Sequence, residues 1–336
     1  MKVMPPTDII DELLRNNRLL ARDVVAHGRT WLLLNNGVLN LHGPLTEADA
    51  RNIQAAVRIA LIQFQQHLDD PRATLQRLDR VLAIHTEARL SVVLNNRNAF
   101  DDLEFLANLP HLRSLLVDGN HALDLAPVAA HVRLVSLRVG GLGTSLVPLR
   151  EYESLERLGV ADRVTDFEVI GTLVNLHELE IRDRCPARLP FLGTLTRLRT
   201  ISFTGAAPKR LDDLKLVHAL SDVSIANVKI DDATIASIGS LATLERLALH
   251  DLPRMSSIKW IKNPRLEELE LVNLEGVRSF APLAELPRLR TLTIDHPLST
   301  SQLKSLAAAP ALKLLRLPER VAEKISTPLP FAVEAI

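Results

Sequence analysis

The chain has 336 residues, of which 47% are hydrophobic and 24% are charged, so it can bury a large core. Its 40 lysines and arginines balance its 40 aspartates and glutamates, which gives no reason to expect broad attraction to nucleic acid or to an anionic membrane. The single cysteine, Cys185, excludes an internal disulfide and a cysteine-rich zinc site.

The beginning of the chain, MKVMPPTDIIDELLRNN, lacks the apolar core of a signal peptide. No stretch of about 18 uncharged apolar residues follows, so we expect no membrane-spanning helix. A chain of this length without disulfides fits a reducing compartment. We therefore expect a cytoplasmic protein that makes no contact with a membrane.

Residues 1–88 differ in pattern from the rest of the chain and are predicted to form an N-terminal α+β capping domain. Thr7 can cap a helix that runs to about His27. The two apolar runs around Asn36 and Gly37 predict a β-hairpin, because Asn-Gly is a strong turn signal. A small functional domain is the alternative interpretation of this region.

Two further helices are predicted before residue 88. Thr46 with Asp49 begins the first of them, and Pro71 begins the second. The apolar face of the first is formed by Ile53, Val57, Ala60, Leu61, Phe64 and Leu68. The second places Leu75, Leu78 and Leu82 inward.

Residues 88–96 are interpreted as a degenerate first strand of a repeating region that extends from residue 89 to residue 318. Val92 and Leu94 lie 23 residues before Leu115 and Val117, which places Arg89 in the first slot of the repeat. The unusual arginine in that slot is typical of a capping unit.

The repeating unit is Leu-x-x-Leu-x-Leu, and it occurs ten times at spacings of 21 to 24 residues. The positions three and five after the first leucine, which we call the anchor, are apolar in every unit. Their alternation with polar residues predicts a short strand. The anchors are Leu112, Leu134, Leu155, Leu176, Leu198, Leu220, Leu244, Leu266, Leu289 and Leu312.

Before each anchor the apolar spacing changes to three, which suits a 3₁₀ or short helical segment with one buried face. One such run is Leu189, Leu192, Leu195 and Leu198. Neither the strand nor the helical return can bury its apolar side alone, so neighbouring units must stack. Residues 319–336, which are interrupted by prolines, are predicted to cap the last unit.

These ten units resemble the leucine-rich repeat proteins, in the short 22-residue form of bacterial internalins and of a phosphatase regulatory subunit. The resemblance implies an α/β solenoid with a parallel β-sheet on its concave face and short 3₁₀ or helical segments on its convex face. One departure is that the family's asparagine, eight residues after the anchor, occurs only as Asn120. In addition, Ser257, Trp260 and Asn263 replace the expected apolar trio before Leu266.

Chemical motifs are absent from the sequence: it contains no P-loop, no GxGxxG after a strand, no HExxH and no GxSxG. His250 and His296 lie beside Asp251 and Asp295 at equivalent places two units apart, too far apart to share one metal without other ligands. We therefore expect no catalytic residue, no metal, no cofactor and no small-molecule substrate. An enzyme with a site in residues 1–88 or at the His250/His296 edge is the alternative.

The outward positions of the strands lie two, four and six residues after each anchor, and a repeat solenoid binds through this surface. None of them is aromatic, so charged side chains are expected to dominate binding. We expect a non-catalytic module that binds a protein partner and no nucleic acid, as a bacterial inhibitor or immunity protein or as a regulatory subunit. The predicted partner-binding residues are Arg138, Arg157, Glu178, Glu180, Arg182, Arg246, His250, Glu268, Glu270 and Asp295.

Overall fold

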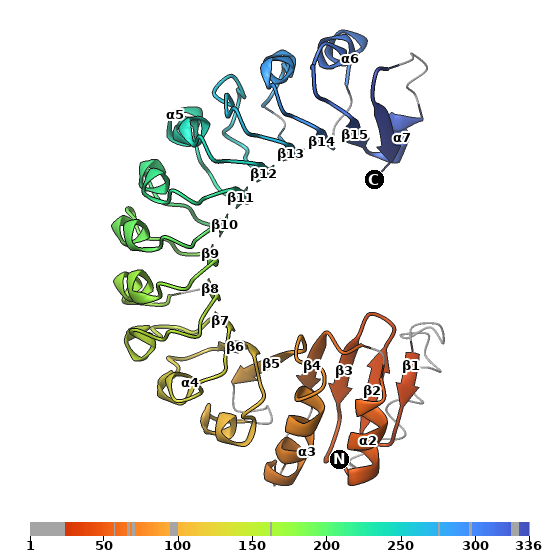
Figure 1. Cartoon of the computed structure of the whole chain (residues 1–336), viewed down its shortest axis with the longest axis vertical. Helices are drawn as coiled ribbons and strands as arrows, with labels where there is room; N and C mark the ends of the chain where they lie inside the picture. The colour runs from red at the N-terminus through yellow and green to blue at the C-terminus, as the bar shows by residue number, and fades with distance from the viewer. Residues whose placement is uncertain are drawn as a thin grey trace. The chain divides into compact units, whose positions relative to one another are not determined.

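The computed structural model describes residues 24–335, apart from 57, 66–67, 69–70, 95–99, 162, 275, 296–297 and 324–328. The chain divides into two compact units, Met1–Val169 and Ile170–Ile336, which we call unit 1 and unit 2 (Figure 1). The expected domain boundaries at residues 88 and 318 stay predictions.

The described part of unit 1 begins with an antiparallel meander of β1 (Val24–His27), β2 (Trp31–Leu34) and β3 (Val38–Leu41). The predicted hairpin is confirmed: the Gly37 amide donates to the Leu34 carbonyl at 2.9 Å, and Gly37 has a φ of 81°. A left-handed glycine after a tight turn is the usual geometry of a three-residue hairpin loop.

Two of the expected helices need correction. The helix expected to reach His27 is wrong at its end, because Val24–His27 is a strand; residues 1–23 lie outside the described part of the chain. The helix beginning after Thr46 ends much earlier than expected, since α2 spans Glu47–Gln54 and β4 spans Leu61–Phe64. Pairing of β4 with β3 overrides the helical spacing of its apolar residues.

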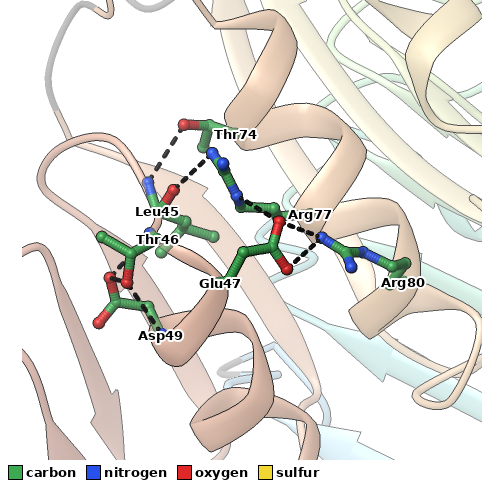
Figure 2. Close-up of polar contacts among 7 residues, drawn as sticks. All are labelled: Leu45, Thr46, Glu47, Asp49, Thr74, Arg77 and Arg80. Atoms are coloured by element: carbon green, nitrogen blue, oxygen red, sulfur yellow. Dashed lines mark hydrogen bonds and ion pairs between the residues drawn. The ribbon is translucent and has the colours of Figure 1, made fainter.

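A polar network joins α2 to α3 (Arg72–Leu82), as Figure 2 shows. Thr46 and Asp49 form the predicted capping box at the start of α2. Arg77 Nη1 donates to the Leu45 carbonyl at 2.9 Å. Glu47 forms ion pairs with Arg77 Nε at 3.0 Å and with Arg80 Nη2 at 2.8 Å. The hydrogen bond from Arg80 contributes most to lowering the pKa of the Glu47 carboxyl, and the hydrogen bond from Arg77 lowers it further.

The parallel part of unit 1 runs from β3 through β4 and β5 (Arg89–Leu94) to β6 (Ser114–Gly119), β7 (Ser136–Val139) and β8 (Arg157–Val160). The returns between these strands include η2 (Glu104–Asn108), α4 (Ala126–Ala129) and η3 (Val147–Leu149). A further return, η4 (Phe167–Thr172), contains the division between the two units.

The expected register of the first strand is wrong by two residues. Arg89 pairs with Ser114 and Val92 pairs with Val117, so β5 precedes β6 by 25 residues and not by 23. Arg89 is therefore not in the anchor slot. It occupies the outward position two residues after the anchor, and its side chain is exposed.

Unit 2 contains β9 (Glu178–Arg182), β10 (Thr200–Thr204), β11 (Asp222–Ala226), β12 (Arg246–His250), β13 (Glu268–Val272), β14 (Thr291–Ile294) and β15 (Leu314–Leu317) in parallel register. A tail strand, β16 (Ala332–Ala335), pairs in parallel with β15. The anchors of all ten repeats are buried, which confirms the predicted solenoid pattern.

The returns of unit 2 lie on the side opposite its strands (Figure 1). Most are 3₁₀, as the spacing of three predicts. They are η5 (Pro190–Thr194), η6 (Asp212–Leu216), α5 (Asp232–Ile235), η7 (Ala236–Ser240), η8 (Ala281–Glu285), α6 (Thr300–Ala307) and α7 (Glu319–Ala322).

A ladder of left-handed turns replaces the missing asparagines. In five successive units the residue seven after the anchor has a φ between 52° and 76°. All five are glycine, asparagine or aspartate, the residues that tolerate this conformation best. Backbone amides of these turns donate hydrogen bonds to the next unit; for example, the Asp183 amide donates to the Thr204 carbonyl at 2.8 Å. The five residues are Asp183, Gly205, Asn227, Asp251 and Asn273.

The irregular unit before Leu266 keeps an apolar interior that is shifted along the chain. Met255, Ile258 and Ile261 are buried there. Asn263 is fully buried and donates from Nδ2 to the Ile238 and Leu241 carbonyls, both at 2.9 Å. These two bonds satisfy carbonyls of the preceding return, which explains why a polar residue occupies this core position.

The exposed sheet face of unit 2 as a candidate functional site

Side chains alternate sharply between the two sides of the unit 2 sheet. On β13, for example, Leu269 and Leu271 are buried, whereas Glu268 is exposed and Glu270 is half-buried. The same alternation recurs on the strands beside it. We call the outward side chains of β9 to β15 the unit 2 face. Because they contribute little to the core, they are available to contact another molecule.

Small side chains occupy the middle of the unit 2 face. The outward positions of β10 hold Thr200, Ser202 and Thr204, and β11 presents Ser224 and Ala226 beside Asp222. Carboxylates stand to either side, on β9 and on β13. A partner backbone or a long partner side chain can therefore approach the middle strands closely.

A shallow depression of about 280 Å³ lies over β10 to β15. The small side chains of Ser224 and Ala248 line it. Around them stand three carboxylates and two arginines. The charged and hydroxyl residues that line it are Thr200, Asp222, Arg246, Glu268, Glu270, Thr291, Thr293 and Arg316.

Both arginines of the depression are already held by carboxylates. Arg246 is hydrogen-bonded to Asp222, and Arg316 Nε lies 2.8 Å from Glu334 Oε2 on β16. These hydrogen bonds raise the pKa of each guanidinium. The depression therefore presents little positive charge of its own.

The two carboxylates of β13 are less well compensated. Glu270 Oε1 lies 3.4 Å from His250 Nε2, a pair that is ionic only when the histidine is protonated. The Glu268 carboxylate forms neither a hydrogen bond nor an ion pair with any residue that the structure describes. As a result, the uncompensated charge of the depression is negative.

The structure places eight of the ten predicted site residues in unit 2. Glu178, Glu180 and Arg182 are on β9, where Arg182 Nε lies 3.0 Å from Glu180 Oε1. Arg246, His250, Glu268 and Glu270 gather on β12 and β13, and Asp295 directly follows β14. Arg138 on β7 and Arg157 on β8 belong to unit 1.

Three residues in or beside the face were not among those predicted from the sequence: Asp222, Arg316 and Glu334. The first two occupy outward repeat positions, so the repeat pattern contained the signal for them. Glu334 lies on β16, in a tail for which no strand was expected, and no repeat signal identifies it.

The alternative hypothesis from the sequence is a catalytic or metal site, and the described residues offer little support for it. Among them, no three His, Cys, Asp or Glu side chains are placed to hold a metal. His296 lies outside the described part of the chain. Burial raises the pKa of the Cys185 thiol to about 12, which keeps it protonated and poorly nucleophilic at neutral pH. No described helix is long and apolar enough to cross a bilayer.

No family model matches the chain. Over 158 residues, or 46% of this chain, it is 30% identical to vasorin of Mus musculus. The chain spans about a fifth of that relative, since the match covers 20% of it.

Two solved structures resemble the chain with a TM-score of 0.50. An internalin, inlF of Listeria monocytogenes, is 17% identical over 94% of this chain and 90% of its own. TLR13, solved in a complex with ssRNA13, is 15% identical over 84% of this chain and 43% of its own. At these identities the likeness shows the fold alone.

Proposed function

Because this chain folds as a leucine-rich repeat solenoid, we propose that it is a non-catalytic module that binds a protein partner through the unit 2 face. The observation that carries the proposal is the depression over β10 to β15, where Glu268 and Glu270 are left without strong partners. Two cellular roles fit such a module. One is an intracellular bacterial inhibitor or immunity protein that covers a toxin, and the other is a regulatory subunit of an enzyme.

Charge complementarity favours a basic partner surface. A lysine or arginine that enters the depression meets Glu268 and Glu270 on one strand and crosses the small side chains of Ser224 and Ala248. Arg246 and Arg316 oppose its approach only weakly, because each is already held by a carboxylate. A basic group can thus form charge-assisted hydrogen bonds without breaking an ion pair of the face.

The absence of aromatic side chains among the outward positions supports the same conclusion. Aromatic anchors usually dominate interface energy, together with arginine. The described outward side chains of β9 to β15 include none, so affinity must come from charge pairs and from close packing on the small middle residues. Binding of this kind is sensitive to ionic strength.

The proposal is tested by comparing the proteins that immobilised variants retain from a lysate of the source organism. We expect the wild-type chain to retain a partner that the double variant Glu268→Gln, Glu270→Gln loses, with affinity reduced about tenfold or more. The matched control is Glu285→Gln, Glu319→Gln, which removes two exposed carboxylates from the helical side of unit 2. Equal retention by all three proteins would refute the unit 2 face as the binding surface.

A further inference from the structure

A second cleft, in unit 1, has the opposite chemistry. Its volume is about 460 Å³, and it lies at the edge of the sheet where β4, β5, β6 and β8 begin. It is independent of the unit 2 face, and no part of the proposed function uses it. Its lining residues are Ala60, Leu61, Thr86, Glu87, Arg89, Arg113, Ser114, Val135, Glu156 and Arg157.

The strand register places two of the arginines in one row, with two serines between them. Arg89 pairs with Ser114, Ser114 with Ser136, and Ser136 with Arg157, so the four residues form one outward row across β5 to β8. Both serines are buried, with 6% and 8% of their surface exposed. Of the two serines, Ser114 lines the cleft, where it lies in the same row as the two long cationic side chains.

The third arginine, Arg113, is the residue directly before β6. Its carbonyl accepts hydrogen bonds from the Val135 and Ser136 amides at 2.9 and 3.0 Å. The Val135 carbonyl in turn accepts from Glu156 at 2.9 Å and from Arg157 at 3.0 Å. This backbone ladder holds the bases of the arginine side chains on rigid structure, which favours a preorganised site.

None of the three guanidinium groups forms an ion pair or a side-chain hydrogen bond with a described residue. In unit 2, by contrast, Arg188 is bound by Asp213, and Arg246 by Asp222. Glu87 and Glu156 also line the cleft, so three arginines face two glutamates and one positive charge remains in excess. The cleft therefore offers a forked set of cationic donors without a carboxylate bound to them.

We infer that this cleft binds a phosphoryl group. A phosphomonoester has three acceptor oxygens and nearly two negative charges, so it can engage three guanidinium groups at once. A single carboxylate carries one charge and two oxygens, so it would neutralise the three arginines less completely. Leu61 and Val135 give the cleft an apolar wall against which the carbon skeleton of the phosphorylated molecule can lie.

The two glutamates favour an isolated phosphoryl group over a long polyanion. A nucleic acid strand that places one phosphate among the arginines would bring its next phosphates toward Glu87 and Glu156. Repulsion between these like charges opposes such binding. The phosphoryl group can be carried by a modified side chain of a protein or by a small phosphorylated molecule, and the experiment separates these sources.

The test is calorimetric titration of the full chain at low ionic strength with four probes. The probes are inorganic phosphate, a peptide with one central phosphoserine, the same peptide without phosphate, and a short single-stranded oligonucleotide. We expect binding of phosphate and the phosphopeptide, with affinity reduced about tenfold in Arg157→Gln and in Arg113→Gln through loss of a charge-assisted hydrogen bond. Tighter binding of the phosphopeptide than of inorganic phosphate would identify a protein as the source. Equal affinities would identify a small molecule.

The control variant is Arg265→Gln, which removes an exposed arginine of unit 2 that lies outside both clefts and has no ion pair with a described residue. It is expected to bind phosphate as the wild type does, and thermal unfolding of each variant shows that it is folded. Failure of the wild type to bind either phosphorylated probe would overturn the inference. Equal affinity in Arg157→Gln, Arg113→Gln and Arg265→Gln, or tighter binding of the oligonucleotide or the unmodified peptide, would overturn it as well.

Discussion

The depression of unit 2 and the cleft of unit 1 are built on the same repeat but leave opposite charges uncompensated. In the depression, Arg246 and Arg316 are held by Asp222 and Glu334, whereas Glu268 is exposed and Glu270 is half-buried. In unit 1 the arginines at positions 89, 113 and 157 have no ion pair with a described residue. The comparison teaches that the number of charged residues does not determine what a repeat surface attracts. What such a surface attracts depends on which of its charges neutralise each other across neighbouring strands.

The largest expected effect is a loss of stability when a core leucine beneath either site is shortened. Leu269 lies beneath the depression and Leu115 lies on β6 beside the cleft, and both side chains are buried. Replacing either by alanine should lower the free energy of unfolding by about 2–5 kcal/mol, because each leaves a cavity in the core. Urea denaturation measures this change. Glu270→Ala is the outward control, and a loss as large as that of Leu269→Ala would show that the inward and outward positions are misassigned.

The second largest effect is expected from an ion pair of unit 2 in which the carboxylate is buried and the arginine is half-exposed. Asp213 accepts from Arg188 Nη2 at 2.6 Å and from the Leu189 amide at 2.7 Å. Asp213→Asn should reduce stability by about 1–3 kcal/mol, because it leaves a buried amide and a guanidinium with weakened acceptors. Denaturant unfolding at neutral pH checks this value.

The lowered pKa of Asp213 predicts that the stability of the protein falls in acid. The hydrogen bond from Arg188 holds the pKa of Asp213 below its usual value, against the desolvation that raises it. Its contribution is therefore fully present above the unfolded-state pKa of about 4 and is lost as the pH falls through the lower folded-state pKa. Unfolding curves between neutral pH and pH of about 2 should show a shallower acid decline in Asp213→Asn. Identical declines in the two proteins would contradict this.

Reversing the charge of the depression should change stability less than the variants above. It should, however, change which ions the depression binds. Asp222→Asn with Glu268→Gln and Glu270→Gln leaves Arg246 without its carboxylate partner. The change in unfolding free energy should be within about 1 kcal/mol, because the Arg246 partner of Asp222 is half-exposed and the two glutamates are not part of the core. In an Arg157→Gln background, calorimetry should then detect phosphate binding in addition to the weakened binding of the background alone. No gain would show that uncompensated charge is insufficient to create an anion site here.

The smallest expected effect concerns the unpartnered arginines themselves. Arg89→Gln should alter the unfolding free energy by less than about 0.5 kcal/mol, because it removes an exposed side chain that has no ion pair with a described residue. Arg77→Gln is the contrasting variant, since Arg77 binds the Leu45 carbonyl and Glu47. Thermal unfolding of both variants compares them. A larger loss for Arg89→Gln would mean that the arginine supports the fold.

Much of the fold could be predicted from residue periodicity, and the failures have physical causes. The anchors and the apolar positions after them identified every repeat strand, because each must face a core that no single unit can enclose. The helix expected through Leu61 and Phe64 is a strand instead, since pairing with β3 outweighed the local spacing. The left-handed turns were not predicted, because only the family's asparagine position was compared; Asp183, Asn227 and Asp251, one residue earlier, carry a signal of their own.

By itself the sequence determined the repeat, the inward leucines and the list of outward side chains, because alternation along a strand follows directly from its pleat. Only the tertiary structure decided the register of β5 and the partner of each charge. Since side chains on a strand repeat every two residues, a shift of two residues keeps Leu90 and Val92 on the same face and leaves the pattern unchanged. That shift nevertheless moves Arg89 into line with Ser114 and Arg157, and so creates the cationic cleft.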